Sequence, residues 1–252
     1  MKYYCFNITT ECNMECSFCY RIGKTIGTVD VEKAFRYIDF LVLDGCTNIN
    51  ISGGEPLLHP KWREIIQYCA LKGLYIIIST NGLLLNLHDP YLKYIKRICI
   101  PLDCLSNDAK SMMRPAEQVR KAQLIIQEYC NNSFDFKLKV NTIVTKQNMS
   151  QLDEIFSIVN HQGIDWKLFE LREKGYFYRY SKSNVMPSEA FSKIVSCFIE
   201  RERECNIFYS GTAINSHLYE RQSDPYVLNY NGDLYLTKQI DDCFIKNIDK
   251  DK

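Results

Sequence analysis

The sequence predicts an α/β domain in which β-strands and α-helices alternate along the chain. Short runs rich in β-branched and aromatic residues recur between longer segments with helical periodicity. The run "LYIIIST" is almost continuously apolar, as in strands of parallel sheets that are covered on both faces. Repeated strand–helix steps are the signature of parallel βαβ units, which wind as an open sheet or curl into a complete or partial barrel.

Six strand–helix steps are expected in the first two thirds of the chain. Strands are predicted at 3–9, 48–52, 74–80, 97–102, 136–144 and 165–171, and helices at 30–45, 61–73, 117–130 and 151–161. After residue 173 the composition becomes more polar and aromatic. We expect a helix at 187–203 and a hairpin at 226–236, in which Asn231-Gly232 suits a two-residue type I′ turn. The sequence thus predicts a core of residues 1–173 and an extension, 174–252, that covers the mouth of the barrel.

The bulk composition excludes several classes of protein. Hydrophobic residues make up 46% of 252 residues, which suffices for a large core, and 31 basic residues face 30 acidic ones. Such a balance provides no overall field that would attract nucleic acid or a membrane surface. No run approaches the ~18 apolar residues of a membrane span, and the first residues do not resemble a signal peptide. We therefore expect a cytoplasmic monomer without a nucleic-acid or membrane partner.

Twelve cysteines in such a chain should be mostly reduced. Three of them, Cys12, Cys16 and Cys19, lie within eight residues after the first predicted strand. A structural zinc site normally needs four ligands, whereas three thiolates suit a metal centre that keeps one position open, such as a [4Fe–4S] cluster. Spacing alone leaves both metals possible. The remaining cysteines, Cys99 among them, are expected to pack as small apolar residues or are scattered without a ligand spacing.

Polar residues follow the predicted strands at their C-terminal ends. They are the cysteine loop, Gly53-Gly54-Glu55, Thr80-Asn81-Gly82, Asp103, Asn141 and Lys167. Because functional residues of (β/α) barrels gather at this end of the strands, we expect one shared mouth.

The pattern C-x-x-x-C-x-x-C, with Phe18 before Cys19 and "SGGEP" at the end of the second strand, resembles the radical SAM superfamily. The resemblance implies a partial (β/α)6 TIM-like barrel of the radical SAM type, a [4Fe–4S] cluster and S-adenosyl-L-methionine. One electron would cleave S-adenosylmethionine to a 5′-deoxyadenosyl radical, which abstracts hydrogen from an unactivated carbon. It also implies an electron donor of the flavodoxin or ferredoxin type.

The resemblance assigns site residues by position. Cys12, Cys16 and Cys19 would ligate the cluster. The residues expected to contact S-adenosylmethionine are Ser52, Gly53, Gly54, Glu55, Ser79, Asn81 and Asn141. Two glycines let the backbone approach a ligand closely, and Glu55 can accept hydrogen bonds from its ammonium.

The segments "FKLKVNTIV", "IDWKLFEL" and "PYVLNYNGDLYL" look like those of viperin-like nucleotide dehydratases. That group binds a nucleoside triphosphate and converts it to a 3′-deoxy-3′,4′-didehydro nucleotide with loss of water. Carried over by position, Lys139 and Lys167 would hold phosphate and Tyr226 would lie near the sugar. Glu170, Asp103 and Tyr226 are candidates for acid or base, because all three should face the mouth.

The chain departs from that group at several positions. Asp165 stands where the group has a phosphate-binding arginine, and Asn48 where it has a lysine, so two of four expected cations are absent. Arg114 or Arg172 could replace them. A nucleotide with fewer phosphates, or another anion, therefore stays open as the substrate.

Two alternatives come from other classes. One is a radical enzyme that modifies a peptide, protein or other small molecule; a second cluster, seen as a doubled iron content, would favour it. The other is a binding protein that keeps a cluster as a sensor, which failure to bind S-adenosylmethionine would indicate.

Overall fold

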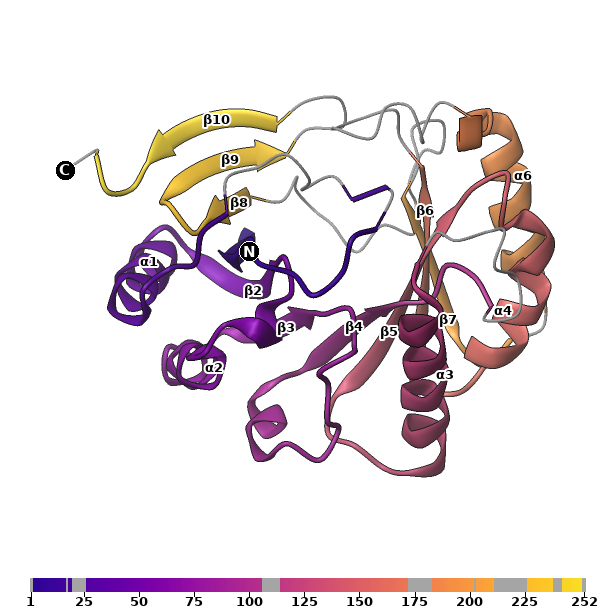
Figure 1. Ribbon diagram of the computed structural model, residues 1–252, viewed down its shortest axis with the longest axis horizontal. Helices are drawn as coiled ribbons and strands as arrows, with labels where there is room; N and C mark the ends of the chain where they lie inside the picture. Colours follow the sequence, from indigo (N-terminus) through magenta and orange to yellow (C-terminus); the bar gives the residue numbers. More distant parts are fainter. Residues whose placement is uncertain are drawn as a thin grey trace.

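The computed structural model describes residues 2–16, 18–19, 26–105, 114–171, 183–201, 203–210, 226–237 and 242–250. Within them one ten-stranded sheet has the order β10-β9-β8-β1-β2-β3-β4-β5-β6-β7 (Figure 1). The strands are β1 (Lys2–Thr9), β2 (Cys46–Gly53), β3 (Tyr75–Ser79), β4 (Arg97–Pro101), β5 (Lys137–Val144), β6 (Ile164–Glu170), β7 (Asn206–Ser210), β8 (Tyr226–Asn229), β9 (Asp233–Thr237) and β10 (Asp242–Asn247). The helices are α1 (Val31–Leu43), α2 (Trp62–Leu71), α3 (Ala116–Asn131), α4 (Leu152–Val159) and α6 (Ser188–Ile199), with short 3₁₀ turns η1 (Pro56–Leu58), η2 (Pro90–Tyr94) and η3 (Met149–Gln151).

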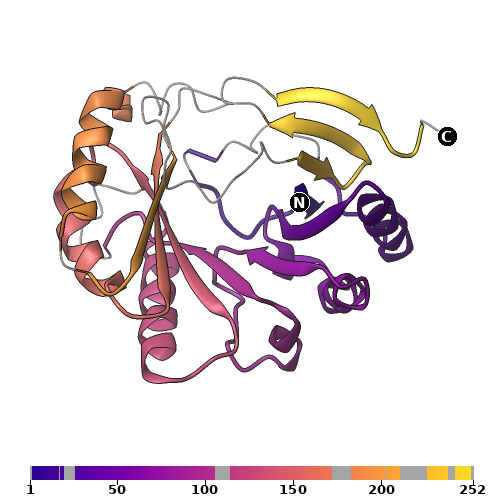
Figure 2. The same ribbon diagram turned by 180° about the vertical axis from the view of Figure 1, so that it is seen from behind.

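The sheet is parallel from β8 through β7 and antiparallel only where β9 and β10 extend it. Figures 1 and 2 show it curled, with the helices along its outer side. The prediction of a parallel α/β fold that forms a partial barrel is confirmed.

Alternation along the strands assigns side chains to two faces. On β1, Tyr4, Phe6 and Ile8 are fully buried in the apolar core against the helices. Cys5 and Asn7 point the other way, into the barrel, and the same alternation runs through the neighbouring strands. The interior of the barrel is therefore polar, and the layer outside it is apolar.

Helix α1 shows how the sequence sets the helical layer. Asp30 caps its first turn by accepting hydrogen bonds from the main-chain NH groups of Glu32 and Lys33. Its buried residues, Ala34, Tyr37, Ile38 and Leu41, follow the spacing of one helical face. Gly45, with a φ of +86°, ends the segment.

The structure contains two strands that were not predicted from the sequence. Residues 206–210 form β7, which pairs in parallel with β6, although no strand was predicted there. Residues 242–247 form β10, which pairs antiparallel with β9 and was not predicted either. Parts of the extension that was expected to cover the mouth, 174–182, 211–225 and 238–241 among them, lie outside the described residues, as does Arg172, so the division at residue 173 stays a prediction.

The predicted hairpin is present, but the prediction that a two-residue type I′ turn connects its strands is wrong. No non-glycine residue of the described chain has a positive φ, whereas a type I′ turn requires one at Asn231 as well as at Gly232. Instead Gly232 NH donates to Asn229 O at 2.9 Å, which closes a three-residue loop that includes Tyr230. A Cβ atom at Gly232 would lie 2.6 Å from the Tyr37 hydroxyl, so packing on α1 also requires glycine there.

Among the described residues, every helix is too short or too polar to cross a lipid bilayer.

Candidate functional site

The loop that carries three cysteines begins directly after β1. Cys12, Cys16 and Cys19 are free thiols, partly exposed, and Cys19 NH donates to Cys16 O at 3.1 Å. Burial raises the pKa of the Cys16 thiol, and the charges of Cys19 and Cys12 raise it further, so the three sulfurs lie in one region. No group of three or more histidine, cysteine or acidic side chains in the described chain is arranged to hold a metal ion. The assignment of the cluster to these cysteines therefore stays a prediction.

Arg114 connects this loop to the barrel. Its Nη1 donates to Cys16 Sγ at 3.5 Å, and its guanidinium lies over the Phe18 ring at 5.0 Å. Its Nε forms an ion pair with Asp103, a fully buried carboxylate whose second oxygen accepts the NH of Ile143 at 2.6 Å. The positive charge opposes the effect of burial on the pKa of Cys16. Because metals bind thiolates, Arg114 favours the form of Cys16 that a cluster needs.

The Gly-Gly-Glu loop is packed on the start of the cysteine loop. Gly54 NH donates to Thr9 O, and Glu55 NH to Glu11 O, both at 2.8 Å. Gly53 has a φ of +135°, and a Cβ atom there would lie 2.0 Å from Thr9 O. The structure thus requires glycine at 53 for contact with the protein's own backbone, next to Cys12.

The carboxylate of Glu55 lies beneath the loop and is fully buried. Oε1 accepts hydrogen bonds from the Thr80 hydroxyl at 2.7 Å and from Leu57 NH at 3.0 Å, and Oε2 accepts Asn81 NH at 2.6 Å. Burial raises the pKa of this carboxyl, while those three donors lower it. Glu55 therefore ties the loop after β2 to the loop after β3, and its predicted contact with the cofactor remains a prediction.

The other residues predicted to contact S-adenosylmethionine lie on the strand ends around this loop. Asn81 Nδ2 donates to Asn13 Oδ1 at 2.7 Å and approaches Cys12 Sγ at 3.9 Å. The Ser79 hydroxyl donates to Asn50 Oδ1 at 2.9 Å. Asn141 Oδ1 is a buried acceptor without a hydrogen-bond partner in the described structure.

These features fit the cofactors that the sequence implies. Three thiols on one loop match the ligands of an iron–sulfur cluster with an open iron. A buried acceptor left unsatisfied at Asn141 costs free energy unless a ligand supplies a donor. Cys12 also lies close to Asn81, which follows β3, and β3 is the neighbour of the strand that leads into the Gly-Gly-Glu loop.

Two lysines point into the barrel from adjacent strands. Lys139 on β5 and Lys167 on β6 are only 7% and 8% exposed. Lys139 Nζ lies 5.1 Å from the centre of the Phe208 ring, and Lys167 Nζ lies 4.7 Å from that of Phe169. The structure thus brings the two predicted phosphate ligands to one side of the interior.

A third cation, Arg97, was not identified from the sequence. Its Nη2 lies 3.1 Å from Asp165 Oδ2; the side chain of Asp165 is buried and that of Arg97 is mostly buried. Asn206 Nδ2 donates to the other carboxylate oxygen of Asp165 at 3.0 Å. The strand pattern could have identified Arg97, because residues two apart on a strand lie on the same face and Arg97 is two residues before Cys99 on β4.

The opposite side of the interior carries amides. Asn7 Nδ2 on β1 donates to Asn229 Oδ1 on β8 at 2.9 Å, and Asn50 Nδ2 on β2 donates to Cys5 Sγ at 3.3 Å. Asn7 Oδ1 is buried without a hydrogen-bond partner among the described residues. Sequence analysis did not identify these amides either.

Two candidate residues lie away from this interior. Tyr226 pairs in register with Tyr4 and stacks on its ring at 4.9 Å, on the face of the sheet that packs against the core. Glu170 accepts a hydrogen bond from the Ser188 hydroxyl of α6, on the helical side of β6. The expectation that both side chains face the mouth does not hold, because each lies on the outer face of the sheet, towards the core and the helices.

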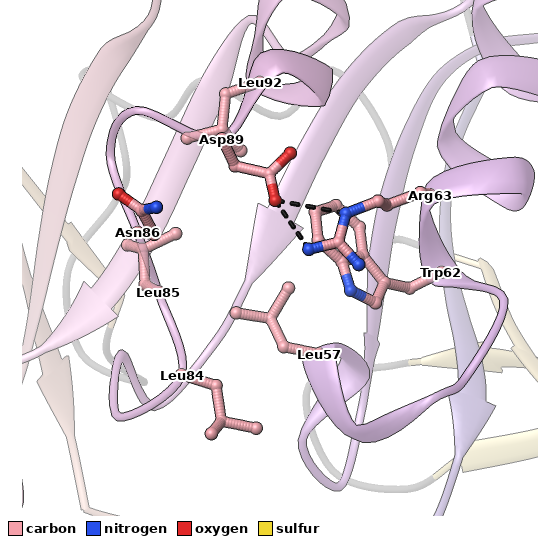
Figure 3. Close-up of a pocket in the computed structure, with 8 residues that line it drawn as sticks. All are labelled: Leu57, Trp62, Arg63, Leu84, Leu85, Asn86, Asp89 and Leu92. Atoms are coloured by element: carbon pink, nitrogen blue, oxygen red, sulfur yellow. Dashed lines mark hydrogen bonds and ion pairs between the residues drawn. The ribbon is translucent and has the colours of Figure 1, made fainter.

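A surface pocket of about 280 Å³ lies outside the barrel, between η1, α2 and the segment before β4 (Figure 3). Arg63 stacks on Trp62 at 4.5 Å, and its Nε and Nη2 donate to Asp89. Four leucines and Asn86 line the rest of it, and it contains none of the predicted site residues.

Comparison with known proteins supplies the family. Residues 6–159 match the radical SAM superfamily. The S-adenosylmethionine-dependent nucleotide dehydratase RSAD2 of Oncorhynchus mykiss is 27% identical over 176 residues, which cover 66% of this chain and 50% of that protein. The subtilosin biosynthesis protein AlbA of Bacillus subtilis is 30% identical over 115 residues, or 43% of this chain and 26% of that protein.

Among solved structures, SuiB of Streptococcus suis bound to S-adenosylmethionine superposes with a TM-score of 0.70 at 18% identity. The match covers 99% of this chain and 64% of SuiB. It shows a shared fold. The chain spans about half the length of the first curated relative that it matches.

Proposed function

Because the chain belongs to the radical SAM superfamily, and is thus an enzyme that uses S-adenosylmethionine and a [4Fe–4S] cluster, we propose that its substrate is a nucleotide. The reaction proposed is a viperin-like dehydration, in which hydrogen abstraction from the sugar leads to loss of a hydroxyl as water. When bound, the cluster and S-adenosylmethionine supply a carbon-centred radical that abstracts hydrogen from an unactivated C–H bond.

One observation carries this proposal. Lys139 and Lys167 lie buried inside the barrel on neighbouring strands. By the resemblance to the dehydratases, these are the two positions expected to hold phosphate. Burial of an ammonium is costly unless anionic or hydrogen-bonding groups surround it, so an interior with several cations suits an anionic ligand. The similarity to the trout dehydratase supports the same substrate class.

The chain's own residues have separate roles under this proposal. Cys12, Cys16 and Cys19 hold the cluster, with Arg114 beside Cys16. The loop from Ser52 to Glu55, together with Ser79, Asn81 and Asn141, positions S-adenosylmethionine. Asp103 and Glu170 are bonded to Arg114 and Ser188, so neither is offered as the acid or base.

Peptide modification is the second candidate. The peptide enzyme SuiB shares the fold over almost the whole chain, and AlbA is similar over part of it. About four irons per chain would match one cluster, and about eight would favour this second candidate.

The test is anaerobic turnover of protein reconstituted with iron and sulfide and reduced with dithionite. Each common nucleoside mono-, di- and triphosphate is supplied with S-adenosylmethionine, and 5′-deoxyadenosine is quantified by mass spectrometry. A rise with one nucleotide and a product lighter by one water would support the proposal. A low rate that no nucleotide increases would refute it and direct the search to peptides.

A further inference from the structure

Asn7 carries a buried hydrogen-bond acceptor that the described part of the protein leaves unused. It lies on the inner face of β1 and is only 7% exposed. Its Nδ2 donates to Asn229 Oδ1 on β8 at 2.9 Å, whereas its own Oδ1 is buried without a hydrogen-bond partner among the described residues. A buried amide oxygen without a donor is costly, so a bound group that supplies an N–H or O–H would be stabilised there.

The neighbouring interior amide shows that the fold can satisfy such a group by itself. Asn50, on β2, donates through Nδ2 to Cys5 Sγ at 3.3 Å and accepts the Ser79 hydroxyl on Oδ1 at 2.9 Å. Asn50 pairs in register with Cys5, and Asn7 is two residues further along β1. Asn7 is therefore nearer to the C-terminal ends of the strands, which is the end of a (β/α) barrel where ligands bind.

Contacts with β8 hold the amide of Asn7 in place. Asn7 pairs in register with Asn229, and the residue after Asn229 packs on another part of the chain: a Cβ atom at Gly27 would lie 2.1 Å from the Tyr230 ring. Because Asn229 accepts the amino group of Asn7, the carbonyl oxygen is turned away from β8. An amide oxygen binds only donors, so the ligand group that meets it is a hydroxyl or an amino group.

Two ligands could supply this donor, S-adenosylmethionine and the substrate. Asn7 is in register with Ser52, at the start of the loop expected to position the cofactor. The match to the superfamily, whose members share that cofactor, ends at residue 159. Asn229 lies beyond it, so the amide pair is completed by a part of the chain that the shared chemistry does not require. This favours the substrate as the source of the donor.

We propose that Asn7, held by Asn229, accepts a hydrogen bond from a hydroxyl or amino group of the substrate, and that the enzyme therefore prefers substrates that carry this donor. In a nucleotide the donors are the sugar hydroxyls and the amino groups of cytosine, adenine and guanine. The inference rests on the proposed nucleotide substrate and adds a residue that recognises its uncharged part.

The experiment compares ligands that differ by one donor, and it measures binding without turnover. Reconstituted protein with S-adenosylmethionine and no reductant is titrated calorimetrically with CTP, UTP, ATP, GTP and ITP, and with the 2′-deoxy and 3′-deoxy forms of each. We expect one pair, such as CTP and UTP or a ribonucleotide and its deoxy form, to differ by about tenfold in favour of the member with the donor. Asn7→Leu, which removes the acceptor, should abolish this preference by weakening the binding of that member.

Three further variants test the geometry. Asn229→Asp keeps an acceptor for Asn7 Nδ2 and should retain the preference, whereas Asn229→Leu should reduce it. Asn229 is partly exposed, so this pair also covers the case in which Asn7→Leu does not fold. Asn132→Leu, at an exposed amide after α3, is the matched control and should leave the preference unchanged.

The affinity for S-adenosylmethionine is measured separately, without nucleotide. If Asn7→Leu weakens the binding of S-adenosylmethionine and leaves the nucleotide preference intact, the donor belongs to the cofactor and the inference is overturned. Nucleotides that bind without any such preference also overturn it, while the proposed function stands. If no nucleotide binds at all, the proposed function fails, and this inference fails with it.

Discussion

At the scale of single residues, Arg114 occupies an unusual position. It bonds at once to a thiol of the cysteine loop and to a fully buried carboxylate, and it stacks on Phe18. Groups that hydrogen-bond metal ligands typically affect metal affinity or activity by 10–100-fold. The contact therefore links the barrel to the electronic properties of any cluster held there.

Replacing Arg114 by Met should make the cluster harder to reduce, because a positive charge and an N–H···S bond stabilise the reduced state. We expect a more negative midpoint potential in a redox titration followed by electron paramagnetic resonance, and activity lower by about tenfold or more. Arg120→Met, at an exposed position of α3, serves as the control. An unchanged potential in Arg114→Met would show that the contact is only structural.

At the scale of elements, the conformation of the turn after β2 is set by contacts with the ends of the neighbouring strands, β1 and β3. Gly53 lies against Thr9 at the end of β1, and Glu55 joins the turn to the end of β3. Two strand ends are thereby held to the loop that carries Cys12.

Gly53→Ala should destabilise the protein, because an alanine there would adopt an unfavourable φ and clash with Thr9 O. Strain of this kind costs about 1–3 kcal/mol, which urea unfolding can measure. Gly73→Ala is a useful comparison, since its φ is also positive but no atom lies within 4 Å of the added Cβ. Equal losses in both variants would argue against the contact with Thr9.

Asp44, at the C-terminal end of α1, bonds to Lys2 and Tyr4 of β1. Burial raises the pKa of this carboxyl, but the hydrogen bonds from Tyr4 and Lys2 outweigh it, and the net pKa is lowered. A lowered pKa contributes stability above the ordinary aspartate value of about 3.9, and this stability is lost as the pH falls through the folded-state pKa. Asp44→Asn should thus be less stable than the parent at pH 7, and the difference should disappear in acid. Asp135→Asn, at an exposed carboxylate, is the control in urea unfolding across pH.

At the scale of the whole molecule, the fold separates an apolar outer layer from a charged interior. Trp166 and Leu168 of β6 pack among the helices, whereas Lys167 between them faces the barrel. Burying charge on that inner face costs free energy unless other groups or a ligand offset it, which a stability measurement can test.

Lys167→Met should keep or raise the free energy of unfolding of the ligand-free protein, since replacing buried charge by an apolar side chain of similar length is often neutral or stabilising. Nucleotide binding should weaken in the same variant. Chemical denaturation with and without nucleotide separates the two effects. A loss of more than about 2 kcal/mol without ligand would assign Lys167 a structural role instead.

The sequence by itself determined the first six strands, the helices between them, the cysteine loop and the Gly-Gly-Glu turn, because periodicity and local spacing are properties of neighbouring residues. The resemblance to the dehydratases also singled out Lys139 and Lys167, whose side chains lie on the inner face of β5 and β6. Only the tertiary structure decided which groups meet. Arg97 reaches Asp165 across the one strand between them, β5. Asn7 contacts Asn229, which lies more than two hundred residues later in the chain, and Tyr226 turns to the core face because β8 pairs in register with β1. Such contacts depend on strand register and on the curvature of the sheet, which no local pattern contains.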